Sequence, residues 1–357
     1  MRILIVKLGS IGDIVHTLPA FAAIRRQYPA ATIGWVVEKR SAEILRGNPM
    51  IDRLVEIDTS ALRKRLPVNQ LIRELGRQIR NVRKFRFDIA LDFQGLLKSA
   101  AIAKLSGAKK RWGFARQALR EPASRIFLTD LVRIPEGANI IKKNLMLAAA
   151  ALGIDQEAEF DFPIIPASKD IAEAESILSS VGGRFAILNP GGGWPTKLWP
   201  AENYGALADR LWNDLGLKSV LVCGPRETAL VERAAAASRS EAIVRSRPGL
   251  KALVELAKKA TVYVGSDTGP THLAMAARAP VVGIFGPTEW WRNGSIEPGD
   301  ICVERTDIDC RINCHRRSCS NWICMDISVE RVFEAVCQRI ERSSGQIPVY
   351  NLNGNRI

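Results

Sequence analysis

Short apolar segments of strand character alternate with amphipathic helical segments along almost the whole chain. This alternation is typical of proteins in which parallel strands are joined by crossover helices that cover both faces of the sheet. The expected strands are 3–7, 32–38, 53–57 and 88–93 in the first half, and 185–190, 219–224, 242–246, 261–266 and 280–286 in the second half. The sequence therefore predicts an α/β fold of the doubly wound type.

The alternation is interrupted at FDFPIIPAS (160–168), which contains two prolines and has no helical period. A helical pattern ends shortly before this segment at Gly153, a residue type favoured just after a helix C-terminus. A chain of 357 residues is also long for one hydrophobic core. We therefore predict two doubly wound domains, 1–163 and 164–325, followed by an amphipathic helix and tail at 326–357.

The net charge of +14 is concentrated in the first half of the chain. Lys and Arg outnumber Asp and Glu by 28 to 16 in residues 1–165, but only by 23 to 21 in residues 166–357. A basic domain beside a nearly neutral one indicates that the first domain faces a polyanion. Nucleic acid, anionic lipid headgroups and a phosphorylated glycolipid are the candidates.

The densest basic region contains a predicted helix at 68–84. Four basic residues lie on one face of it: Arg73, Arg77, Arg80 and Lys84. Another face carries an apolar stripe: Ile72, Leu75, Ile79 and Val82. Such a helix can lie on an anionic membrane surface. It can equally be a solvated helix packed on its own domain, and the pattern leaves both interpretations open.

The sequence predicts no membrane-spanning or secretory segment. No apolar run approaches the roughly 18 residues that a membrane-spanning helix needs. The N-terminal apolar stretch is four residues long, Ile3 to Val6, which is too short for the core of a signal peptide. We therefore expect a cytoplasmic protein.

The turn after the first strand, KLGSIGD (7–13), contains two glycines and leads into a helix. Its spacing matches neither the dinucleotide fingerprint nor the Walker loop. Asp13 follows the carboxyl end of a predicted central strand, where open α/β sheets bind their ligands. A carboxylate in that position can serve as a general base, or it can simply cap the following helix.

Two loops of the second half have the composition of phosphate and ribose sites. NPGGGWPTKLWP (189–200) follows a strand, and its glycines, Thr196 and Lys197 can surround an anion with amide, hydroxyl and ammonium donors. A plain Gly/Pro loop explains the glycines but not the lysine. In CGPRE (223–227), Glu227 can accept hydrogen bonds from both hydroxyls of a ribose, although this pattern alone is weak.

The segment GSDTGPTHLAMAA (265–277) places a helix start directly after a strand. Thr268 and the amide of Gly269 can bind a diphosphate at the helix N-terminus. Asp267 and His272 lie within one turn of that position. A helical histidine is usually structural, but one beside an acid at a helix N-terminus is a better candidate for function.

Taken together, these segments resemble glycosyltransferase family 9, the ADP-heptose:lipopolysaccharide heptosyltransferases. KLGSIGDIVHTLPA is similar to the opening motif of the family, PGGGWPTKLWP to its phosphate loop and SDTGPTHLAMA to its donor-site motif. DFQGLLKSA (92–100) is similar to a segment typical of heptosyltransferase I, which adds the first heptose to Kdo. The matches run from residue 1 to about residue 340 in the order of the family.

The resemblance implies a GT-B fold, with an N-terminal acceptor domain and a C-terminal nucleotide-sugar domain separated by a cleft. It implies an inverting transfer of heptose from ADP-heptose to Kdo-lipid A, with no metal and no cofactor, at the inner face of the inner membrane. By position, Asp13 resembles the general base and Glu227 the ribose ligand. The diphosphate ligands would be Lys197 and Thr268 with Gly269, and the heptose contacts Asp267 and His272.

Four cysteines depart from the catalytic motifs: Cys310, Cys314, Cys319 and Cys324. Their spacing, C-x3-C-x4-C-x4-C, matches no standard zinc pattern. Reduced, buried or redox-labile thiols are the expected alternative in a cytoplasmic protein. The sequence does not decide between these interpretations.

Three other functions compete with a heptosyltransferase, and one of them, a non-catalytic glycan-binding relative, is disfavoured because the candidate base and the phosphate loop are both intact. A basic nucleic-acid-binding protein would explain the charge, but the basic residues are not interleaved with aromatic ones and no binding motif is present. A transferase of the same fold that uses another nucleotide sugar, or that adds a later heptose, differs only in a few contacts of the site. We therefore expect no nucleic-acid partner.

Overall fold

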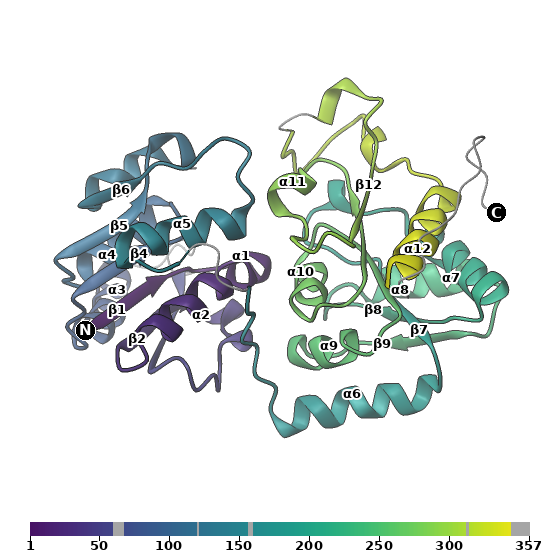
Figure 1. The fold of residues 1–357 in the computed structure, drawn as a ribbon, viewed down its shortest axis with the longest axis horizontal. Helices are drawn as coiled ribbons and strands as arrows, with labels where there is room; N and C mark the ends of the chain where they lie inside the picture. Colours follow the sequence, from purple (N-terminus) through teal and green to yellow (C-terminus); the bar gives the residue numbers. More distant parts are fainter. Residues whose placement is uncertain (60–67, 120, 156–159, 312–313, 344–357) are drawn as a thin grey trace. The chain divides into compact units, whose positions relative to one another are not determined.

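The structure is a computed structural model that describes residues 1–59, 68–119, 121–155, 160–311 and 314–343. The chain divides into two compact units, one ending at Ile165 and the other beginning at Pro166. Each unit contains a six-stranded sheet whose strand pairs are all parallel, with helices in the connections (Figure 1). The predicted α/β doubly wound fold is confirmed.

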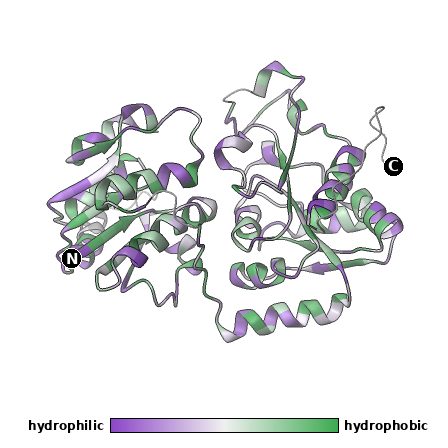
Figure 2. Cartoon of the chain, viewed as in Figure 1, coloured by the Kyte–Doolittle hydropathy of each residue, from purple (hydrophilic) through white to green (hydrophobic). Residues whose placement is uncertain are grey.

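The first unit has the strand order β3-β2-β1-β4-β5-β6. Its strands are β1 (Arg2–Val6), β2 (Thr32–Glu38), β3 (Arg53–Ile57), β4 (Ile89–Asp92), β5 (Lys110–Phe114) and β6 (Asp130–Val132). Its helices are α1 (Ile11–Val15), α2 (Leu18–Gln27), α3 (Val68–Arg83), α4 (Leu97–Leu105) and α5 (Ile140–Leu152), with 3-10 turns η1 (Lys39–Ile44), η3 (Arg116–Ala118) and η4 (Pro122–Phe127). Helix α2 packs on α5, and α3 packs on α4. The strands β1 and β2 are coloured mostly as hydrophobic in Figure 2, as expected for strands covered on both faces.

The second unit repeats this topology, with the order β12-β11-β10-β7-β8-β9. Its strands are β7 (Phe185–Asn189), β8 (Lys218–Val222), β9 (Ile243–Ser246), β10 (Val262–Ser266), β11 (Val281–Phe285) and β12 (Ile301–Glu304). Its helices are α6 (Ser168–Val181), α7 (Ala201–Leu215), α8 (Thr228–Ala237), α9 (Leu250–Ala257), α10 (Gly269–Ala276), α11 (Trp290–Asn293) and α12 (Val329–Ser343), with 3-10 turns η5 (Pro195–Lys197), η6 (Asp309–Arg311) and η7 (Ile323–Met325). The terminal helix α12 packs on α7 and so belongs to this unit.

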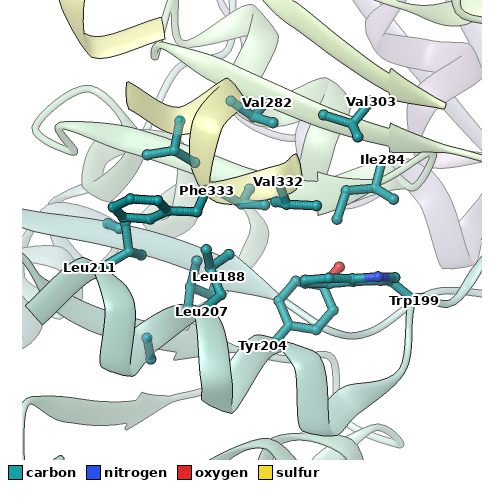
Figure 3. Packing of buried hydrophobic residues seen from close by; sticks show 14 of the residues in the cluster. Leu188, Trp199, Tyr204, Leu207, Leu211, Val282, Ile284, Val303, Val332 and Phe333 are labelled. Atoms are coloured by element: carbon teal, nitrogen blue, oxygen red, sulfur yellow. The ribbon is translucent and has the colours of Figure 1, made fainter. Parts of the chain in front are cut away.

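The hydrophobic core of the second unit includes side chains of the strands from which its loops extend. Leu207 of α7 and Val332 and Phe333 of α12 point into the same apolar cluster (Figure 3). Trp199 and Tyr204 meet edge to face, with ring centroids 4.9 Å apart, and both are buried. Because Trp199 ends the loop that follows β7, this packing fixes one end of that loop.

Two separate helices, α1 and α2, follow β1. Pro19 lies in the first turn of α2, where its missing amide hydrogen costs no helical hydrogen bond. Strands β5, β6 and β12 were not among the expected strands. They are short and partly exposed, so they lack the continuous apolar run that reveals a central parallel strand.

Candidate functional site

Both units have a crossover point where the strand order reverses. In the second unit it lies between β7 and β10, because β8 and β9 extend the sheet on one side and β11 and β12 on the other. Open α/β sheets bind ligands at such a point, beyond the carboxyl ends of the strands. The loops after β7, β8 and β10, together with the first turns of α10, carry every donor-site residue expected from the sequence.

Lys197, Asp267 and His272 form one hydrogen-bonded group at this point. The Lys197 ammonium lies 2.6 Å from Asp267 Oδ2 and also donates to the Asp267 carbonyl at 3.2 Å. Asp267 Oδ1 lies 3.0 Å from His272 Nε2. The structure therefore brings together three residues that are up to 75 positions apart in the chain.

The carboxylate of Asp267 is buried, with 4% of its side chain exposed. Burial by itself raises the pKa of Asp267, but His272 and Lys197 outweigh it and hold the pKa well below its usual range. Asp267 is therefore ionised at neutral pH. A fixed negative charge beside Lys197 orients the ammonium group while leaving the pair close to neutral overall.

Thr268 caps helix α10, whose first turn contains Pro270. The Thr268 hydroxyl contacts Thr271 Oγ1 at 3.3 Å and accepts from the Asn189 amide at 3.4 Å. Amides in the first turn of a helix have no partner within the helix, and the helix dipole favours an anion there. Together with Lys197, this helix start can bind a diphosphate.

Asn189, which the sequence analysis did not single out, ties the loop after β7 to the one after β10. Its side-chain NH2 group also donates to the Tyr263 hydroxyl at 3.0 Å, and its side-chain oxygen Oδ1 accepts from Gly191 N at 3.1 Å. The residue is buried. A polar residue ending the apolar strand FAILN is the signal that could have revealed it.

Glu227 packs against the loop after β7. Its carboxylate accepts from Gly224 N at 2.8 Å and packs against Gly191, where a Cβ atom would lie 2.2 Å from Oε2. A Cβ at Gly192 would lie 2.7 Å from the methyl group of Thr268. These two glycines are therefore required by the close approach of the Glu227 and Thr268 loops.

Thr196 is buried, and its hydroxyl donates to the Arg316 carbonyl at 2.6 Å. The Thr196 carbonyl accepts from Trp322 Nε1 at 2.9 Å. The hydroxyl hydrogen is thus engaged within the protein, so donation to a phosphate by Thr196 requires this bond to break. These contacts attach the lysine loop to the segment that carries the four clustered cysteines.

All seven cysteines are free thiols. Cys310, Cys314, Cys319 and Cys324 line one cavity of about 120 Å³. Burial raises the pKa of Cys324, whereas hydrogen bonds from backbone amides lower that of Cys319. In the part of the chain that the structure describes, no three His, Cys, Asp or Glu side chains are arranged to hold a metal ion.

Asp13 lies in helix α1, directly after β1 of the first unit. Its Oδ2 accepts from Ser10 N at 2.8 Å, and its Oδ1 lies 3.3 Å from the Lys7 ammonium. Asp13 keeps 37% of its side chain exposed, whereas Lys7 keeps 2%. Asp13 therefore takes part in capping the helix, as one of the two interpretations predicted, and part of its carboxylate remains exposed to solvent.

The pKa of Asp13 reflects opposing effects. Burial raises it, but the charge of Lys7 and the hydrogen bond from Ser10 outweigh burial and hold it below its usual range. Asp13 is consequently ionised at neutral pH and able to accept a proton. Gly9, three positions after Val6, has φ +140°, and a Cβ there would lie 2.7 Å from Ser41 Oγ, which explains the glycine in this turn.

Lys7 and Asp92 were also not selected from the sequence. Lys7 is buried, and its ammonium donates to the Phe93 carbonyl at 2.9 Å. Asp92 has no exposed surface, and burial raises its pKa to about 6. A charged residue at the end of a buried strand, as in RILIVK and IALD, is the signal common to both.

The four basic residues expected on one helix face are exposed. Arg73, Arg77 and Arg80 lie on α3, and Lys84 follows its end. Of the expected apolar stripe, Val82 is buried and Ile79 is half-buried, while the side chains of Ile72 and Leu75 lie outside the described residues. Among the helices that the structure describes, none combines the length and apolarity needed to cross a bilayer.

The chain is similar to known proteins over most of its length. The family model described as glycosyltransferase family 9 (heptosyltransferase) matches residues 72–322. The chain is 31% identical over 292 residues to lipopolysaccharide heptosyltransferase 1 of Pseudomonas aeruginosa, covering 81% of this chain and 79% of that protein. It is 28% identical over 295 residues to lipopolysaccharide heptosyltransferase 1 of Escherichia coli, covering 81% and 89%.

Solved structures show the same fold. E. coli heptosyltransferase WaaC with ADP aligns with a TM-score of 0.76 and 24% identity, covering 95% of this chain and all of that one. A glycosyl transferase of family 9 from Veillonella parvula aligns with a TM-score of 0.78 and 21% identity, covering 96% and 97%. The fold is therefore that of the GT-B proteins, which confirms the prediction.

Proposed function

The chain belongs to glycosyltransferase family 9 and is therefore a heptosyltransferase, and from this premise we propose that it transfers L-glycero-D-manno-heptose from ADP-heptose to Kdo of the lipopolysaccharide inner core. The relatives at 31% and 28% identity are both named lipopolysaccharide heptosyltransferase 1. This similarity supports addition of the first heptose over a later one.

The group at the β7–β10 crossover point is the observation that carries the proposal. The N-terminus of α10 supplies positive potential where a diphosphate would bind, and Lys197 supplies an ammonium donor that Asp267 holds in place. Charge that develops on departing ADP is stabilised by donors already held in place, so we propose that the reaction needs no metal and no cofactor. Glu227 would bind the ribose, and Asp267 and His272 would contact the heptose.

Within this proposal the second unit binds the donor and the first unit binds the acceptor. The Asp13 carboxylate takes the proton from a Kdo hydroxyl, and that oxygen attacks the anomeric carbon of the heptose. The bond from the anomeric carbon to the phosphate oxygen breaks, and ADP leaves with the electron pair. A single displacement of this kind inverts the anomeric configuration.

The acceptor, Kdo-lipid A, is anionic and embedded in a membrane, which suits the basic first unit. The exposed residues Arg73, Arg77, Arg80 and Lys84 would contact the anionic headgroups at the inner face of the inner membrane. We therefore propose that the protein works in the cytoplasm as a peripheral membrane protein, without a nucleic-acid partner.

The proposal is tested by incubating the protein with ADP-heptose and Kdo-lipid A and measuring the product by mass spectrometry. We expect the mass of one heptose to be added, and turnover to persist in a metal chelator. ADP-glucose and an acceptor that already carries one heptose serve as alternative substrates. Preferential use of either alternative, or a salt-dependent gel shift with nucleic acid in place of transfer, contradicts the proposed function.

A further inference from the structure

The end of β4 and the turn that follows it support the turn that precedes Asp13 through three consecutive residues: Asp92, Phe93 and Gln94. Strands β1 and β4 are neighbours in the sheet, so their carboxyl ends lie side by side. Gln94 acts through its side chain, Phe93 through its backbone carbonyl group, and Asp92 through the backbone of Gln94.

Gln94 makes the direct contact. Its side-chain oxygen accepts from Leu8 N at 3.1 Å and from Gly9 N at 3.4 Å. These two amides immediately precede Ser10, whose own amide donates to the Asp13 carboxylate. The side-chain oxygen of Gln94 therefore fixes the backbone immediately before Ser10, whose amide binds Asp13.

Asp92 and Phe93 complete the support. Asp92 Oδ1 accepts from Gln94 N at 3.0 Å and from Gly95 N at 3.2 Å, and this fixes the backbone that carries Gln94. The Phe93 carbonyl accepts from the Lys7 ammonium, which lies 3.3 Å from Asp13. The same turn thus holds both the loop of Asp13 and its charged partner.

We infer that Gln94 is a positioning residue for Asp13, holding the Leu8–Gly9 backbone so that the carboxylate of Asp13 remains between the Ser10 amide and Lys7. The inference rests on the proposed function, in which Asp13 removes the proton of the acceptor. Displacement of a reacting group by about 1 Å can lower a rate by about 10²-fold, so loss of this hydrogen bond acts on turnover and not on donor binding.

The test compares Gln94→Leu, which removes the acceptor at similar size, with Gln94→Glu, which retains a side-chain oxygen. Gln78→Leu is the matched control, because Gln78 is also half-buried in the first unit and its amide donates at 3.3 Å to Asp58 O. With a soluble Kdo acceptor, we expect Gln94→Leu to lower kcat about 10- to 100-fold with an unchanged KM for ADP-heptose. The kcat of Gln94→Glu should be at least ten-fold higher than that of Gln94→Leu.

A second measurement does not depend on the reaction. Amide hydrogen exchange at Leu8 and Gly9 should become faster in Gln94→Leu and stay close to wild type in Gln94→Glu and Gln78→Leu. Unchanged exchange in Gln94→Leu, or equal losses of kcat in Gln94→Leu and Gln78→Leu, overturns the inference. If the wild-type protein transfers no heptose, the proposed function fails, and the exchange rates still show whether Gln94 holds the loop.

Discussion

Each unit pairs a lysine with an aspartate near the carboxyl ends of its central strands. The two pairs differ in which side chain is more exposed to solvent. In the first unit Lys7 keeps 2% of its side chain exposed and Asp13 keeps 37%. In the second unit Lys197 keeps 14% exposed and Asp267 keeps 4%. The buried partner is thus the cation in one unit and the anion in the other.

This reversal gives one fold two opposite electrostatic sites. A buried lysine keeps a more exposed carboxylate ionised, which suits removal of a proton from an acceptor. A buried aspartate holds a more accessible ammonium group in place, which suits binding of a diphosphate. The partner fixed in the interior of each unit therefore determines the chemistry offered at the surface.

Substitution of the two accessible partners should produce the largest and most different effects. We expect Asp13→Asn to lower kcat by about 10²- to 10⁴-fold, the usual contribution of a general base, with nearly unchanged affinity for ADP. Steady-state kinetics and calorimetric titration with ADP measure the two quantities. If Asp13→Asn retains most of its turnover, Asp13 is not the base and the two pairs do not divide the work as proposed.

Lys197→Met keeps much of the side-chain length but removes its charge. We expect kcat/KM for ADP-heptose to fall about 10²- to 10³-fold, as for loss of one donor to a developing negative charge. ADP affinity should also fall, which distinguishes this variant from Asp13→Asn. Wild-type affinity for ADP in Lys197→Met contradicts the role of the second pair.

The two units should also differ in their interaction with membranes. We expect replacement of Arg73, Arg77 and Arg80 by Gln to raise the KM for Kdo-lipid A in anionic vesicles about ten- to a hundred-fold, with little change for a soluble acceptor. Exposed arginines of the second unit are the matched control, and replacing Arg233, Arg239 and Arg245 should leave both values unchanged. Equal effects on the embedded and soluble acceptors contradict membrane docking by α3.

The last effect concerns stability and compares two buried aspartates. Because the pKa of Asp92 rises from 3.8 to about 6 on folding, its ionisation opposes folding by roughly 3 kcal/mol above pH 6. Relative to Asp92→Asn, the wild-type free energy of unfolding should therefore fall as pH rises from about 4 to 6. Urea unfolding across this range measures the difference.

Asp267 should show the opposite sign. Its folded pKa is lowered, so its stabilising contribution is present above the unfolded pKa near 4 and is lost as pH falls further. Relative to Asp267→Asn, the wild-type protein should gain stability as pH rises from about 2 to 5. If both aspartates shift stability in the same direction, their surroundings do not set their ionisation as described.

The sequence predicted the central strands well because they are covered on both faces and read as continuous apolar runs. The expected strands 32–38 and 53–57 have the bounds found for β2 and β3. Strand β5, KRWGF, was missed because its exposed and charged residues give it no apolar run. Likewise, Asp13 and Lys197 were chosen from their loops, whereas Asn189 and Gln94 matter through contacts with loops far away in the chain.

The sequence alone determined the two doubly wound units and the position of charged residues at strand ends, because apolar periodicity and loop composition are local properties. The tertiary structure decided which charges are paired and which partner of each pair is buried, since those depend on neighbouring strands that come from distant segments. Burial and the charged or hydrogen-bonding groups nearby in space together set the ionisation of a side chain, and neither follows from the residues adjacent to it in the sequence. For this reason the opposite character of the Lys7–Asp13 and Lys197–Asp267 pairs became visible only in the folded chain.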